Sequence, residues 1–214
     1  MNIGNKDVLI ERLEVGPLST NCYIVTNLAD KVTMVVDPGG SYPRIKAYLD
    51  DMLAETGSKV ALLVNTHGHW DHIYHNVDVL RDYPEAKLYI HKEDEPMLAK
   101  DDTGMIGALT PTTPDAYLED GMTLMLGNMP IKVLHTPGHS QGGVCLLFAE
   151  KYLIAGDTLF KGSIGRTDFH KGSYQELVNS IRTKLLPLAD EVFVLPGHGP
   201  TSTIGYERAN NMFL

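Results

Sequence analysis

The segment NTHGHWDH at positions 65–72 most constrains what this chain can fold into. It directly follows the apolar run Val60–Val64, so it is expected at the end of a strand. A loop in that place can aim several side chains at one point, and Gly68 lets the backbone turn tightly. Imidazole and carboxylate groups together suit zinc, and also iron or manganese. The segment predicts a metal site with four ligands within six residues: His67, His69, Asp71 and His72.

Three further candidate ligands each follow an apolar run through a turn that contains glycine. His139 ends TPGH, Asp157 ends AGD and His198 lies in PGHG. Loops at one edge of a sheet stack are where sites of this kind are built, so these side chains are expected to join the cluster. A lone histidine after a strand is more often structural. We interpret His139, Asp157 and His198 as ligands because the cluster at 67–72 is also present. The remaining histidines are interpreted as structural, with His135 also considered as a hydrogen-bond partner of a ligand: His75, His91, His135 and His170.

The composition limits the partners of the chain. Its formal net charge of −9 argues against binding to a nucleic acid backbone, which needs a basic surface. The N-terminus lacks a basic region followed by an apolar stretch, and the longest apolar run, Val144–Ala149, is too short to cross a membrane. The two cysteines, Cys22 and Cys145, lie in apolar runs and are expected as reduced thiols. We expect a cytoplasmic protein without nucleic acid or membrane partners, and its oligomeric state stays open.

Local patterns predict mostly strands, with a few helices between them. Runs rich in Val, Ile, Leu and Tyr predict strands at Val8–Leu13, Cys22–Thr26, Thr33–Val36, Val60–Val64, Lys87–Ile90, Ile131–Leu134, Val144–Phe148, Tyr152–Ala155 and Val192–Leu195. Helix signals predict Pro43–Thr56, His72–Asp82 and Tyr174–Leu186. This order indicates an α/β protein whose sheets are covered by helices on their outer faces.

The combined motifs resemble those of the metallo-β-lactamase superfamily. The resemblance rests on THGHWDH (66–72), TPGH (136–139), GD (156–157) and PGHG (196–199), in that order, and on VDPGG (36–40). It covers essentially the whole chain. It implies a four-layer αββα sandwich, formed by residues 1–214 as one domain, with the metals at one edge between the sheets.

The resemblance also implies which ligands hold which metal. His67, His69 and His139 correspond to the ligands of the first ion, and Asp71, His72 and His198 to those of the second. Asp157 corresponds to the bridging ligand. Every position of this two-metal pattern is filled, so two divalent ions are expected, with zinc favoured and iron or manganese as alternatives. Asp37 either orients a ligand histidine or is a plain turn residue.

Within the superfamily, the chain is most similar to single-domain hydrolases of the glyoxalase II type. The segment GDTLFKGSIGRTDF (156–169) and the short C-terminal tail YERANNMFL (206–214) carry this likeness. Two features differ from glyoxalase II. The chain ends too soon for the extra helical domain that helps to hold glutathione, and IYHN (73–76) stands where small residues are usual. Both features weaken the case for glutathione recognition.

The function that the resemblance implies is hydrolysis of a small-molecule thioester of the S-lactoylglutathione type by a metal-bound hydroxide. Asp71 is expected to hold the hydroxide as well as a metal, and Arg166 to bind a substrate carboxylate. An ion pair from Arg166 to Asp168 is the alternative role for that arginine. Persulfide dioxygenases share the fold and a GRTDF-like segment, but use one iron held by His67, His139 and Asp157 in the present numbering. A β-lactamase is less favoured, because the GRTDF loop and the short tail point elsewhere.

Overall fold

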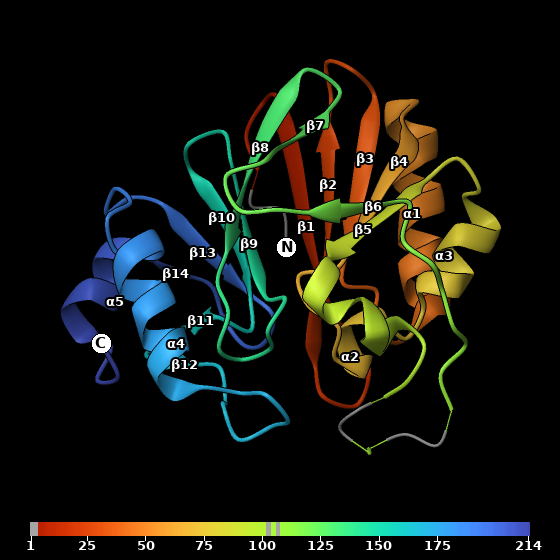
Figure 1. Cartoon of the computed structure of the whole chain (residues 1–214). Helices are drawn as coiled ribbons and strands as arrows, with labels where there is room; N and C mark the ends of the chain where they lie inside the picture. The colour runs from red at the N-terminus through yellow and green to blue at the C-terminus, as the bar shows by residue number, and fades with distance from the viewer. Residues whose placement is uncertain (1–3, 102–103, 106–107) are drawn as a thin grey trace.

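Two β-sheets lie face to face in the computed structural model, which describes residues 4–101, 104–105 and 108–214. The first sheet has the strand order β1-β2-β3-β4-β5-β6 and the second has the order β14-β13-β10-β9-β8-β7. Helices α1 and α3 cover the outer face of the first sheet, and α4 and α5 cover that of the second (Figure 1). The expected αββα sandwich is therefore confirmed.

The first sheet is built from the N-terminal half of the chain. Its first three strands pair antiparallel, whereas β3 to β6 are parallel and need crossovers between them. Its elements are β1 (Val8–Val15), β2 (Thr20–Asn27), β3 (Val32–Val36), α1 (Tyr42–Thr56), β4 (Lys59–Val64), α2 (Trp70–Ile73), α3 (Asn76–Asp82), β5 (Lys87–His91), the 3₁₀-helix η1 (Lys92–Leu98) and β6 (Ala116–Leu118).

The second sheet follows in the C-terminal half. Strands β7 to β10 form an antiparallel meander. Strand β13 pairs parallel to β10, and β14 pairs antiparallel to β13 as the edge strand. Its elements, with a separate two-stranded hairpin, are β7 (Thr123–Leu126), β8 (Met129–His135), β9 (Val144–Phe148), β10 (Tyr152–Gly156), β11 (Leu159–Phe160), β12 (Ser163–Ile164), α4 (Tyr174–Ser180), the π-helix η2 (Ile181–Leu185), β13 (Phe193–Pro196), β14 (Ser202–Thr203) and α5 (Ile204–Asn210).

The predicted strands are all present, and the predicted helices differ in detail. The segment 72–82, expected as one helix, is divided into α2 and α3. The division falls at His75, whose φ of −105° and ψ of 19° leave the helical region and whose backbone N–H donates to the carbonyl of Pro38 at 3.0 Å. The strands that sequence patterns missed are short, at two to four residues, because so few residues carry no readable period: β6, β7, β11, β12 and β14.

Three apolar clusters stabilise the layers. One fills the space between the sheets and includes Phe148 and Tyr152, whose side chains are both 1% exposed. A second lies between the first sheet and α1 and α3, and a third lies between the second sheet and α4. In the part of the chain that the structure describes, no helix has the length and apolar character needed to cross a membrane.

Replacement of Phe148 by alanine is expected to destabilise the fold by about 3–5 kcal/mol, because it leaves a cavity between the two sheets. The free energy of unfolding measured in urea tests this expectation. Met125→Ala, at a side chain that is 47% exposed on β7, is the matched control and should change that free energy by less than about 0.5 kcal/mol. Equal effects of the two substitutions would contradict the proposed position of the core.

Candidate metal centre

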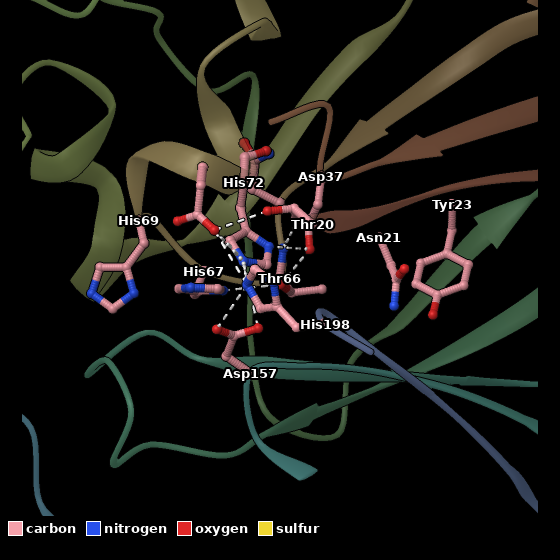
Figure 2. A network of polar contacts seen from close by, with 12 residues as sticks. Thr20, Asn21, Tyr23, Asp37, Thr66, His67, His69, His72, Asp157 and His198 are labelled. Carbon is pink, nitrogen blue, oxygen red and sulfur yellow. Dashed lines mark hydrogen bonds and ion pairs between the residues drawn. The ribbon is translucent and has the colours of Figure 1, made fainter. Parts of the chain in front are cut away.

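The predicted ligands all lie at one edge of the two sheets. His67 and His69 follow β4, and Asp71 and His72 lie on the short helix α2 that comes next. The other three follow strands of the second sheet: His139 after β8, Asp157 at the end of β10 and His198 after β13. The structure therefore brings all seven side chains, from four loops, to the mouth between the sheets. Figure 2 shows His67, His69, His72, Asp157 and His198 among them.

The nitrogen and oxygen atoms of these side chains converge in three overlapping groups. Within each group the candidate ligand atoms lie within 4.8 Å of one another. The groups are His67, His69 and His139; His67, His72 and Asp157; and Asp71, His72 and His198. The first and third groups match the two ligand sets expected from the sequence.

Asp157 lies between the two ligand sets. Its Oδ2 is 3.5 Å from Nε2 of His139, which belongs to the first set, and 3.5 Å from Nε2 of His198, which belongs to the second. Its Oδ1 is 3.4 Å from Nε2 of His72. One carboxylate thus reaches both halves of the cluster, which is the geometry that a bridging ligand requires.

Two buried atoms of the cluster have no hydrogen-bond partner among the residues that the structure describes. They are Nε2 of His67 and Oδ1 of Asp157, and both point into the cluster rather than toward solvent. A buried polar atom without a partner costs about 1–3 kcal/mol. Neutral imidazole and carboxylate are ligands that zinc, iron and manganese accept, so a divalent cation would satisfy both atoms. The residues present fit a metal centre.

The second ring nitrogen of several histidines is occupied, which orients the ring. His139 donates from Nδ1 to the carbonyl oxygen of Arg166 at 2.7 Å, and His198 donates from Nδ1 to the carbonyl oxygen of Leu18 at 3.0 Å. Because a carbonyl can only accept, the lone pair of each ring, when the ring is neutral, lies on Nε2 inside the cluster. Nε2 of His139 lies 2.8 Å from Nδ1 of His69 there.

Asp37 orients one histidine from each half of the cluster. Its Oδ2 lies 2.9 Å from Nδ1 of His72 and accepts a hydrogen bond from the Thr66 hydroxyl at 2.7 Å. The same hydroxyl lies 3.1 Å from Nδ1 of His67. Asp37 has a φ of 55°, so it also forms the turn after β3. It therefore combines both roles that the sequence suggested for it.

Sequence reasoning missed the polar side chains of β2 that hold the loop of His198. Asn21 donates from Nδ2 to the carbonyls of Pro196 and Gly199, both at 2.9 Å, and the Tyr23 hydroxyl donates to Pro196 at 2.8 Å. The Thr20 hydroxyl donates to Asp71 at 2.9 Å (Figure 2). The polar pair Thr20 and Asn21 at the start of an apolar strand was the available signal.

Asp94, at the start of η1, was also missed. Its buried carboxylate accepts from the backbone N–H of Gly68 at 3.0 Å and from that of Gly142 at 2.6 Å. These glycines belong to the loops that carry His69 and His139. A Cβ atom at Gly142 would lie 2.6 Å from the Asp94 carboxyl carbon, so glycine is needed for this approach. Asp94 thus joins the two loops of the first ligand set.

Burial and charge set the protonation of the cluster in the absence of a metal. Burial lowers the pKa of His67 well below its ordinary value, and lowers that of His69 to about 3. Burial alone would lower the pKa of His72 too, but the carboxylates of Asp71, Asp157 and Asp37 raise it to about 10. Neutral His67 and His69 suit a metal, while the carboxylates favour a positive charge at His72, where a cation would replace the proton.

A cavity of about 420 Å³ opens beside the cluster. Arg166 lines it, as expected, and also forms the alternative ion pair, donating from Nε and Nη2 to Asp168 at 2.7 Å each. Its guanidinium lies 4.2 Å from the ring centroid of Phe169, which is itself 4.8 Å from the ring of His69. His135, by contrast, stacks on His91 with the ring centroids 4.0 Å apart, and its Nε2 lies 2.8 Å from the carbonyl oxygen of Gln141.

Comparison with known proteins agrees with this geometry. Residues 15–202 match the sequence profile of the Metallo-beta-lactamase superfamily. The Hydroxyacylglutathione hydrolase GloC of Haemophilus influenzae is 34% identical over 212 residues, which cover 96% of this chain and 97% of that protein. The crystal structure of the BLEG-1 B3 metallo-beta-lactamase is 33% identical with a TM-score of 0.88, covering 96% of this chain and 99% of the other. That of TTHA1623 in a di-iron-bound form is 31% identical with a TM-score of 0.80, covering 95% and 100%.

Asp37→Asn is expected to lower metal affinity by about 10- to 100-fold. The carboxylate accepts through both oxygens, from the Thr66 backbone N–H at Oδ1 and from the Thr66 hydroxyl and His72 at Oδ2, and the amide nitrogen of asparagine can accept at neither position. Asparagine tolerates the left-handed backbone of this position, so the fold should persist. Metal content after dialysis against a graded chelator series measures the effect, with exposed Asp7→Asn as the control. Unchanged metal retention in Asp37→Asn would show that Asp37 acts only in the turn.

Proposed function

The chain belongs to the metallo-beta-lactamase superfamily, and on that premise we propose that it is a binuclear-metal hydrolase of thioesters of the S-lactoylglutathione type. The observation that carries the proposal is the position of Asp157 between two sets of ligand atoms, at the floor of an open cavity. The likeness to a hydroxyacylglutathione hydrolase over nearly the full length of both chains supports the choice of thioesters.

Two divalent ions are proposed, with zinc first and iron or manganese as alternatives. His67, His69 and His139 would hold one ion, and Asp71, His72 and His198 the other, with Asp157 shared. When bound, the ions supply Lewis acidity, which makes hydroxide available from water near neutral pH and polarises the thioester carbonyl. The likeness to a protein solved with two irons keeps iron among the candidates.

The side chains of the cavity would orient the reaction. Burial raises the pKa of the Asp71 carboxyl, but His72, His198 and the Thr20 hydroxyl outweigh this effect and lower that pKa below its ordinary value. An ionised carboxylate can accept a hydrogen bond from the attacking water and hold its lone pair toward the carbonyl carbon. Thiolate is a good leaving group, so attack is followed by cleavage of the carbon–sulfur bond, and the acid and the thiol are released.

Assays of one preparation distinguish thioester hydrolysis from two other activities, β-lactam hydrolysis and persulfide dioxygenation. The likeness to a B3 metallo-beta-lactamase favours including a β-lactam substrate beside the thioester. The one-iron dioxygenase that the GRTDF segment also suggested would show one iron per chain and oxygen uptake on glutathione persulfide. Two metals per chain with thioester hydrolysis and slow β-lactam turnover is the result that the proposal requires.

His69→Ala is expected to lower thioester hydrolysis by at least about 100-fold and to reduce bound metal, because even the loss of a residue that only supports a ligand costs 10- to 100-fold. Steady-state kinetics and metal analysis on the same sample measure both effects. His170→Ala, at an exposed histidine outside the cluster, is the control. Full activity in His69→Ala would refute the proposed mechanism.

Arg166→Ala is expected to raise KM for a carboxylate-bearing thioester about tenfold with little change in kcat, because the guanidinium would bind substrate and not the reacting atoms. Arg182→Ala, on η2 and away from this cavity, is the charge-matched control. An unchanged KM would leave Arg166 only its ion pair with Asp168.

A further inference from the structure

We propose that the β11–β12 hairpin forms an apolar wall that selects thioesters with an apolar group beside the reacting carbonyl, and that helix α5 holds this wall in place through Glu207 and Asn211. The inference rests on the proposed function for the identity of the reaction. The wall and its attachment to α5 are properties of the structure alone.

The hairpin faces the metal ligands across the cavity. Phe160 and Ile164 line the cavity from the hairpin, and the Phe160 ring lies edge-on to His198 with its centroid at 6.2 Å. Phe169 lines it from the following loop, next to the ring of His69. Leu18, Trp70 and Met105 add apolar lining from the N-terminal half of the chain. Aromatic and aliphatic side chains thus flank both halves of the ligand cluster.

Charge is scarce in the same cavity. Among the described residues that line it, Arg166 is the one charged side chain besides the candidate ligands. Its guanidinium is already bound through two nitrogens by Asp168. One cationic side chain, Arg166, is thus available to a carboxylate of the thiol part, whereas an apolar group on the acyl side can bury its surface against the wall.

Helix α5 holds the turn of the hairpin from behind. The side chain of Glu207 is fully buried, and its Oε2 accepts from the backbone N–H of Gly162 at 2.9 Å and from Nδ2 of Asn211 at 2.8 Å. The Asn211 amide also donates to the carbonyl of Ser163 at 3.0 Å. The Ser202 hydroxyl donates to Oε1 of Glu207. Side chains of the C-terminal tail thus bind the N–H of Gly162 in the turn and the carbonyl of Ser163 at the start of β12.

These hydrogen bonds attach the hairpin to the C-terminal tail. Hydrogen bonds to a buried carboxylate are stronger than those between neutral groups, so they can fix a turn of only two residues between short strands. The strand β12 leads through Gly165 to Arg166, whose carbonyl accepts from His139. A wall that is already held in one position loses little conformational entropy when a substrate group binds to it.

The test uses two thioesters that differ only beside the carbonyl. S-Mandeloylglutathione carries a phenyl ring where S-lactoylglutathione carries a methyl group. The wild type should prefer the mandeloyl substrate in kcat/KM by about tenfold, within the range that apolar pockets achieve. Asn211→Ala should reduce this ratio to about threefold or less through KM, with bound metal unchanged. Asn210→Ala, at the exposed neighbour whose amide bonds only its own helix, should keep the ratio.

Binding of a neutral apolar probe gives a second measurement that needs no hydrolysis. Trp70 is the sole tryptophan and lines the cavity, so energy transfer from Trp70 to N-phenylnaphthylamine reports occupancy. Asn211→Ala should weaken this binding about threefold or more, and Phe160→Ala, which removes part of the wall directly, should do the same. Phe160→Ala also serves if Asn211→Ala does not fold.

The outcomes separate the two proposals. If the wild type hydrolyses neither thioester but the probe binding falls in Asn211→Ala and not in Asn210→Ala, the thioesterase proposal fails and the wall stands. If thioesters are hydrolysed and Asn211→Ala or Phe160→Ala keeps the wild-type substrate ratio and probe affinity, the wall is refuted. Loss of thermal stability in Asn211→Ala with an unchanged ratio would likewise refute it and leave Glu207 and Asn211 a structural role only.

Discussion

The structure depends on the burial of a dense polar cluster at the edge between two apolar sheets. Most of its imidazoles and carboxylates are buried, and each polar atom left without a partner would cost about 1–3 kcal/mol. The surrounding loops therefore supply partners that cross from one sheet to the other. Asp37 and Asp94 hold ligand-bearing loops, and Asn21 on β2 holds the loop of His198 from the second sheet. Of the buried side-chain atoms that have no hydrogen-bond partner among the described residues, two belong to the cluster, Nε2 of His67 and Oδ1 of Asp157, and a divalent cation would satisfy them.

Glycines make this convergence possible because several backbones approach closer than a side chain would permit. A Cβ atom at Gly39 would lie 1.3 Å from the carbonyl oxygen of Asp71, and one at Gly197 would lie 2.1 Å from Oδ1 of Asp157. The recurrent glycines of the motifs are thus explained by packing between loops as well as by turning. The candidate ligands and the loops that hold them form one tightly packed unit, and packing of this kind preorganises a site.

The cavity beside the cluster joins this rigid centre to a wall supplied by the C-terminal half. Arg166 takes part in both, since its carbonyl orients His139 while its guanidinium lies at the cavity over Phe169. One short segment of chain thus contacts both the cavity and a candidate ligand. The buried Glu207 of the C-terminal tail also binds the hairpin that faces the cluster of candidate ligands.

The sequence by itself determined the main strands and the candidate ligands, because strand periodicity and the spacing of His67, His69, Asp71 and His72 are local properties. It also named His139, Asp157 and His198 through their turns after strands, and the structure brings them to the same edge. Only the tertiary structure decided the partners of these side chains. Asp94, Asn21 and Glu207 act across distances of 26 to 178 residues along the chain, and no local pattern encodes a contact of that separation. The break of one helix at His75 has the same origin, since a hydrogen bond to Pro38 from another loop overrides helix propensity.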